Sequence, residues 1–221
     1  TRCAWNKLIA AFLWCKMAYC LHQLTNMFLR CTAATADDIE QMSKLVESAL
    51  RAGALGFSTS RTPLHRSKSG ELVPGTTADA SELLGIGEAI RRVGHGVFQF
   101  APEHARLPVD EWPWMRQLAE VTGQPVCVNL NQPDSAPEVW REVLGLLDTA
   151  AADNVPLYAQ IAGRSIGILY CLHGSVHPLL FHPAYTEVAD LPMPERLAAL
   201  ADPERRRRLV HEIPDDGGFF Q

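Results

Sequence analysis

Helix and strand patterns alternate four times between residues 35 and 161, and this alternation restricts the possible folds more than any other feature of the chain. In each repeat, apolar residues with helical spacing are followed by a short, nearly continuous apolar run. The alternation is typical of parallel strands joined by crossover helices. The expected pairs are helix 35–52 with strand 54–60, helix 79–93 with strand 96–101, helix 111–122 with strand 125–130, and helix 137–153 with strand 155–161.

The ends of these segments carry specific signals. Thr35 and Asp38 have the spacing of a capping box at the start of the first helix. Residues that tolerate the left-handed conformation follow the helices, and we expect them to end each one. They are Gly53, Gly94, Gly123 and Asn154.

The rhythm suits either a (β/α)8 barrel or a doubly wound sheet. Four units in about 110 residues match the unit of roughly 30 residues found in a barrel. A nucleotide-binding doubly wound sheet needs a glycine-rich phosphate loop, and no G-x-G-x-x-G occurs. We therefore predict an α/β fold, a partial (β/α)8 TIM-type barrel with about four parallel strands alternating with helices. Residues 163–190 break the rhythm, and a polar helix is expected from about Pro194 to Glu212.

Residues 1–34 differ in composition from the rest of the chain. They contain four of the six cysteines and an apolar run over residues 8–15. This run is shorter than the 20 or so apolar residues needed to cross a membrane. We interpret the segment as an atypical helix packed on the rest, with a membrane-surface anchor as the alternative. The expected domains are thus an apolar, cysteine-rich helical segment, 1–34, and a partial barrel domain, 35–221.

Charge and cysteine content narrow the choice of partners and compartment. The formal net charge is −5, and the only dense basic run, residues 205–208, is followed by acidic residues, so nucleic acid is not an expected partner. The six cysteines lack the paired short spacings of a zinc site or a disulfide scaffold. The simplest expectation is a cytoplasmic protein that binds neither nucleic acid nor membrane.

Polar residues recur where the four predicted strands end. Because parallel strands end at one edge of a sheet, we expect these side chains to lie together. Amides and hydroxyls can orient an amide or carboxylate, and an arginine can pair with a carboxylate. Strand capping and loop solvation are the alternative for each residue taken singly. The residues predicted to line the substrate side, in orienting roles, are Ser60, Arg61, Gln99, Asn129, Gln160 and His177.

Three histidines, His173, His177 and His182, fall within ten residues. Imidazole is a common metal ligand, but Gly174 and Pro178 oppose the helix on which two of them would face one ion. Hydrogen bonding in a substrate loop is therefore the favoured interpretation. No catalytic residue and no metal ligand is assigned from the sequence.

Several long motifs resemble a known family. A-G-A-L-G-F-S-T-S-R-T over residues 52–62 and H-R-S-K-S-G-E-L-V-P-G-T over 65–76 are similar to the N-acyl-D-amino-acid deacylase, or D-aminoacylase, branch of the amidohydrolase superfamily. The resemblance continues through G-H-G-V-F-Q at 94–99, A-Q-I-A-G-R-S-I-G-I-L-Y at 159–170 and H-P-L-L-F-H-P-A-Y at 177–185. It covers about residues 35–213.

The resemblance implies a (β/α)8 barrel and zinc-dependent hydrolysis of linear amide (C–N) bonds in N-acyl amino acids or related amides. The chain lacks the family's H-x-H pair, and Ala101 and Leu130 stand near two of its metal-binding positions. We therefore expect a deacylase-like hydrolase fragment, inactive as an isolated chain. The alternative is a non-catalytic module that binds a small ligand or pairs with another chain. Open barrel edges would favour self-association.

Overall fold

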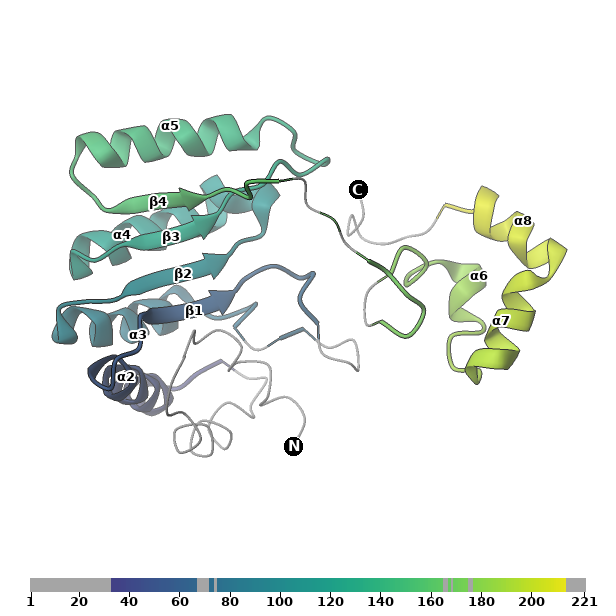
Figure 1. Cartoon of the computed structure of the whole chain (residues 1–221), viewed down its shortest axis with the longest axis horizontal. Helices are drawn as coiled ribbons and strands as arrows, with labels where there is room; N and C mark the ends of the chain where they lie inside the picture. Colours follow the sequence, from purple (N-terminus) through teal and green to yellow (C-terminus); the bar gives the residue numbers. More distant parts are fainter. Residues whose placement is uncertain are drawn as a thin grey trace. The chain divides into compact units, whose positions relative to one another are not determined.

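The computed structural model describes residues 33–66, 72–73, 75–164, 167, 169–174 and 177–213. These residues form two compact units, one up to residue 165 and one from residue 166 onward (Figure 1). The predicted helix within residues 1–34 lies outside the described residues. Across the described ranges, no helix is both long enough and apolar enough to cross a membrane.

The first unit is a four-stranded parallel sheet. Strands β1 (Gly56–Ser60), β2 (Val97–Ala101), β3 (Val126–Asn129) and β4 (Leu157–Gln160) lie side by side in the order in which they occur along the chain (Figure 1). Consecutive order is the arrangement of a barrel, whereas a doubly wound sheet reverses its order at a switch point. The prediction of a partial (β/α)8 barrel with four parallel strands is confirmed.

Helices alternate with these strands as predicted. They are α2 (Ala36–Arg51), α3 (Ala80–Val93), α4 (Trp112–Thr122) and α5 (Val139–Ala152). A short 3-10 helix, η2 (His104–Arg106), and a π-helical turn, η3 (Leu107–Glu111), precede α4. The sequence pattern did not predict these two turns, which carry the chain from the end of β2 to the start of α4.

The predicted helix ends are confirmed. The Thr35 backbone N–H donates to Asp38 Oδ2 at 2.9 Å, and the Asp38 N–H donates to Thr35 Oγ1 at 3.2 Å, which completes the capping box. Positive φ angles occur where the sequence predicts left-handed residues: 103° at Gly53, 80° at Gly94, 63° at Gly123 and 60° at Asn154.

The two faces of the sheet differ in chemistry. Alternate residues, among them Phe98, Phe100 and Val128, are buried on the face toward the helices. The Trp114 ring of α4 packs 4.8 Å from the Phe100 ring, measured between centroids. The opposite face, here called the open face, would line the interior of a closed barrel. It is polar and partly exposed, and Tyr158 on β4 is 54% exposed.

The second unit contains three short helices: α6 (Pro183–Thr186), α7 (Met193–Ala201) and α8 (Pro203–His211). The prediction of one polar helix from Pro194 to Glu212 is wrong, because the chain turns at Asp202 (φ −56°, ψ 129°). Pro203 lacks the N–H that a continuous helix needs, and its ring disfavours a helical conformation at the residue before it. The Asp202 carboxylate instead caps α8 by accepting from the Arg205 N–H at 2.9 Å.

An acidic residue just beyond α6 ties that helix to α8. The Glu187 carboxylate lies 2.7 Å from Arg208 Nη2 and 2.8 Å from Arg205 Nη1. Hydrogen bonds from Arg208, and then from Arg205, lower the pKa of Glu187 from its ordinary 4.5 to about 2. This carboxylate therefore stays ionised in the folded unit at pH values where an unfolded chain binds a proton.

Glu187→Gln should flatten the acid dependence of stability in the second unit. A carboxyl group with a lowered pKa stabilises the fold above its unfolded pKa, and this contribution is lost as pH falls from about 4.5 toward 2. The thermal unfolding midpoint of the wild type should therefore exceed that of Glu187→Gln at pH 6. The two midpoints should converge as the pH falls to 2. Asp190→Asn, at an exposed turn position of the same unit, is the matched control. Parallel curves for the wild type and Glu187→Gln would contradict the assignment.

Candidate functional site

A hydrogen-bonded row of side chains crosses three strands on the open face. The Ser58 hydroxyl on β1 donates to Gln99 Oε1 on β2, its register partner. Gln99 Nε2 donates in turn to Asn129 Oδ1 on β3 at 3.0 Å. Within the described residues, the side-chain N–H groups of Asn129 make no hydrogen bond of their own. The row, here called the amide row, thus fixes the Gln99 amide and ends in donors that can meet a ligand.

A hydroxyl and an imidazole meet at the end of β1. Ser60 Oγ lies 2.6 Å from Nδ1 of His65, which is held in the turn by a backbone bond from its N–H to the Thr62 carbonyl at 3.3 Å. A second backbone bond, from the Val73 N–H to the His65 carbonyl at 3.2 Å, supports the same turn. Desolvation lowers the pKa of His65, which favours the neutral ring. A neutral Nδ1 can accept the proton of the Ser60 hydroxyl.

A second imidazole lies after β2. Asn131 Nδ2 donates to His104 Nε2 at 3.0 Å, so the His104 proton resides on Nδ1. Burial lowers the pKa of His104. Burial raises the pKa of neighbouring Glu103, an effect that the Ala105 backbone N–H opposes and the Glu111 charge reinforces. This edge of the sheet thus carries a carboxyl group with a raised pKa beside an imidazole with a lowered pKa.

Arg61 follows Ser60 but faces the helices. Its Nε lies 3.1 Å from both carboxylate oxygens of Glu111, and its Nη1 donates to the Gly75 carbonyl at 3.3 Å. Glu111 also accepts from Trp114 Nε1 at 2.6 Å. The Arg61 and Glu111 side chains are only 14% and 4% exposed. The guanidinium is thus engaged in a structural ion pair, and a role in holding a substrate carboxylate stays a prediction.

The other predicted site residues divide between the two units. Gln160, exposed at the end of β4, pairs in register with Asn129 and so extends the polar edge of the first unit. His177 belongs to the second unit, where it is 3% exposed and its ring lies edge-on to Tyr185 at 4.7 Å. Burial, and then the Arg196 charge, lowers the pKa of His177. The structure therefore brings together Ser60, Gln99, Asn129 and Gln160.

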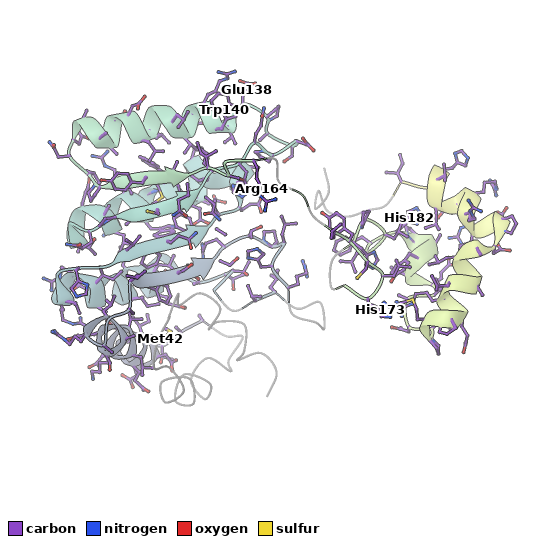
Figure 2. The ribbon with its side chains drawn as sticks, in the orientation of Figure 1. Met42, Glu138, Trp140, Arg164, His173 and His182 are labelled. Atoms are coloured by element: carbon purple, nitrogen blue, oxygen red, sulfur yellow. The ribbon has the colours of Figure 1, made fainter. Side chains whose placement is uncertain are left out.

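The histidines of the second unit have different surroundings. His182 Nδ1 accepts from the Ala184 N–H at 3.1 Å and caps α6, while its Nε2 donates to the Glu212 carbonyl at 3.2 Å. His173 is exposed and lies apart from His182 (Figure 2). His182 therefore has a structural role.

The donor types of the amide row do not suit zinc. Zinc in proteins takes thiolate, imidazole or carboxylate ligands, whereas the amide row presents hydroxyl and carboxamide groups. Over the part of the chain that the structure describes, no group of three or more His, Cys, Asp or Glu side chains could hold a metal ion. Ala101 and Leu130, at the ends of β2 and β3, carry no donor atom. The side chains of the described residues at this edge therefore do not form a zinc ligand set.

Sequence reasoning omitted three residues that the structure places at this edge. His65 is within reach of Ser60 because of a turn, and His104 and Asn131 meet across 27 positions of sequence. The sequence signal for His104 was its position directly after Glu103, shortly beyond the end of the predicted strand 96–101. No signal in the sequence marks its contact with Asn131, which depends on how the ends of β2 and β3 lie together.

Solved structures are similar to this chain over part of their length. D-aminoacylase, described in a study of its binuclear metal centre, matches 62% of the chain and 27% of its own length at 20% identity and a TM-score of 0.51. N-acyl-D-glutamate deacylase from Bordetella bronchiseptica, complexed with zinc and a phosphonate inhibitor, matches 59% of the chain and 26% of its own length at 22% identity and a TM-score of 0.48. No protein-family model matches the chain. No curated protein sequence matches it.

The likeness to D-aminoacylase concerns the fold. The chain spans about a quarter of the length of the solved structures that it matches. In this chain, the strands of the matched region pair in parallel with their neighbours in sequence.

Proposed function

We propose that this chain is the substrate-orienting part of a hydrolase that acts on linear amide (C–N) bonds, of the N-acyl-D-amino-acid deacylase type. The observation that carries the proposal is the amide row on the open face, where Ser58, Gln99 and Asn129 are linked in sequence by hydrogen bonds. The family motifs of residues 52–62 and the D-aminoacylase-like fold support it.

The row suits an amide because it offers both donors and acceptors on a rigid support. Side chains on neighbouring strands are held about 4.8 Å apart by the sheet, so their spacing does not depend on a mobile loop. A substrate carbonyl can accept from the Asn129 amide, and Gln160 can contact the same ligand from β4. Ser60, at the end of β1, contacts the reacting end of the substrate. A ligand-orienting role for His177, which belongs to the second unit, stays a separate prediction.

In this proposal the residues of the chain bind and orient the amide, and activation of water for amide hydrolysis is assigned to none of the described residues. The isolated chain then binds N-acyl amino acids without hydrolysing them. The proposed ligand is a small molecule with one amide and one carboxylate.

Gln99→Leu should weaken binding of an N-acetyl amino acid about tenfold. The substitution keeps the side-chain volume but removes the central donor and acceptor of the row, and a net hydrogen bond contributes about 1 kcal/mol. Calorimetric titration with N-acetyl-D- and N-acetyl-L-amino acids measures the change. Gln117→Leu, on the exposed side of α4, is the matched control and should bind as the wild type does. Equal affinity of Gln99→Leu and the wild type would refute the proposed site.

The second candidate is a non-catalytic module that pairs with another chain. It is favoured by the open face, where Tyr158 is 54% exposed on a strand that, within the described sheet, pairs only with β3. Metal analysis and sedimentation separate the candidates. Stoichiometric zinc with amide hydrolysis supports an enzyme, and metal-free protein of one fixed oligomeric state supports the module.

A further inference from the structure

Ser60 and His65 have the geometry of a nucleophile and its base. Oγ of Ser60 lies 2.6 Å from Nδ1 of His65, within the range at which a general base takes a hydroxyl proton. Neither group is enclosed: Ser60 is half-buried and His65 is exposed, so a reagent can reach the pair from solvent. Ser60 and His65 are five positions apart in the sequence. The backbone hydrogen bonds of the turn at His65 hold this contact in place.

The neighbours of Ser60 on the open face complete a site for an acyl group. Ala101 is the register partner of Ser60 on β2. Asn129 occupies the corresponding register position on the next strand, β3. Two strand spacings put the backbones of Ser60 and Asn129 about 10 Å apart. Ala101, whose side chain is a single methyl group, occupies the register position between them. An acyl carbonyl above Ala101 therefore meets the Ser60 hydroxyl on one side and the Asn129 amide on the other.

We infer that Ser60 is a nucleophile toward activated acyl and phosphonyl compounds, with His65 as its general base and the Asn129 amide as donor to the developing oxyanion. This inference uses the site of the proposed function but adds a covalent step that the orienting role does not require.

The step balances without a further reactant. With an aryl ester, the Ser60 Oγ–C bond forms, the bond from the acyl carbon to the aryl oxygen breaks, and the Oγ proton passes to His65 Nδ1 and then to the leaving aryloxide. Water then attacks the acyl-serine and gives its proton to His65, and the proton returns to Oγ as the ester bond breaks. With a fluorophosphonate, the Oγ–P bond forms, the P–F bond breaks and fluoride leaves, the Oγ proton passes to His65 Nδ1, and the adduct persists.

A fluorophosphonate reagent tests the inference on the full chain. We expect one adduct by intact-protein mass, and peptide mapping should place it on Ser60. Ser60→Ala should abolish the adduct. His65→Gln should slow its formation about 10²-fold, because the base is lost, and Asn129→Leu should slow it to a similar extent. Ser48→Ala, at an exposed position in α2, is the control and should react at the wild-type rate.

Two results would overturn the inference: an adduct on a residue other than Ser60, or a His65→Gln variant that reacts as fast as the wild type. His65 is exposed on a turn, so its replacement should leave the circular dichroism spectrum unchanged, which separates loss of the base from loss of the fold. Amide-ligand binding is measured independently. Labelling without binding removes the proposed function alone, and binding without labelling removes this inference alone.

Discussion

Gly56→Ala should destabilise the first unit by about 3 kcal/mol, at the upper end of the usual cost of overpacking. A Cβ added at Gly56 would lie 2.8 Å from the backbone nitrogen of Val97, and closer still to the Val97 carbonyl oxygen. These atoms belong to β2, the strand paired with β1, so they cannot move aside as a flexible side chain could. Urea unfolding followed by the fluorescence of Trp114, which is buried against β2, measures the loss.

Gly145→Ala is the matched control for this prediction, with the opposite expected sign. Gly145 lies within α5, and an added Cβ there meets no atom within 4 Å. Alanine in a helix interior is favoured over glycine, so this variant should be more stable by about 0.5–1 kcal/mol. If the two alanine variants changed stability equally, close contact between β1 and β2 would not be the reason for glycine at position 56.

Glu111→Gln should lower the free energy of unfolding by about 3 kcal/mol. The substitution keeps the shape of the side chain and an acceptor for Trp114 Nε1, but it leaves the 14%-exposed Arg61 guanidinium without its carboxylate. Removing one partner of a buried ion pair is costly because the remaining charge has lost contact with water. Urea unfolding midpoints of the variant and the wild type give the difference.

The adjacent residue supplies the control for Glu111→Gln. Asp110 pairs with Arg106 on the surface, where the two side chains are 43% and 63% exposed. Asp110→Asn removes an exposed pair of the same kind, and water and salt compensate for its loss. Its effect should be far smaller than that of Glu111→Gln. Similar losses for the two variants would show that burial of the Arg61–Glu111 pair contributes little.

The fold of the first unit could be predicted because its signals are local. Apolar spacing marks each helix, and Gly94, Gly123 and Asn154 mark where the helices end. Each strand begins one or two residues later than predicted, as at β1, which starts at Gly56 after the 76%-exposed Leu55. Apolar character alone does not reveal where ladder pairing starts, because pairing depends on the neighbouring strand.

The candidate site was less predictable, since its geometry arises from pairs distant in sequence. Alternation along β1 places Ser58 and Ser60 on one face and Arg61 on the other, which the sequence pattern could have shown. The partner of Arg61, however, lies 50 residues away in a π-helical turn with no sequence signature. The break at Asp202–Pro203 was not predicted, although a proline disfavours a helical conformation at the residue before it.

The strand order determines how such a sheet can gain or lose strands. Each described strand pairs only with its neighbours in the sequence, so no strand depends on a partner from a remote part of the chain. Adding a helix and strand beyond β4, or removing them, leaves every other pairing and register as it was. A sheet of this kind can be divided, duplicated or extended at its edge by whole units, with the polar row on the remaining strands preserved.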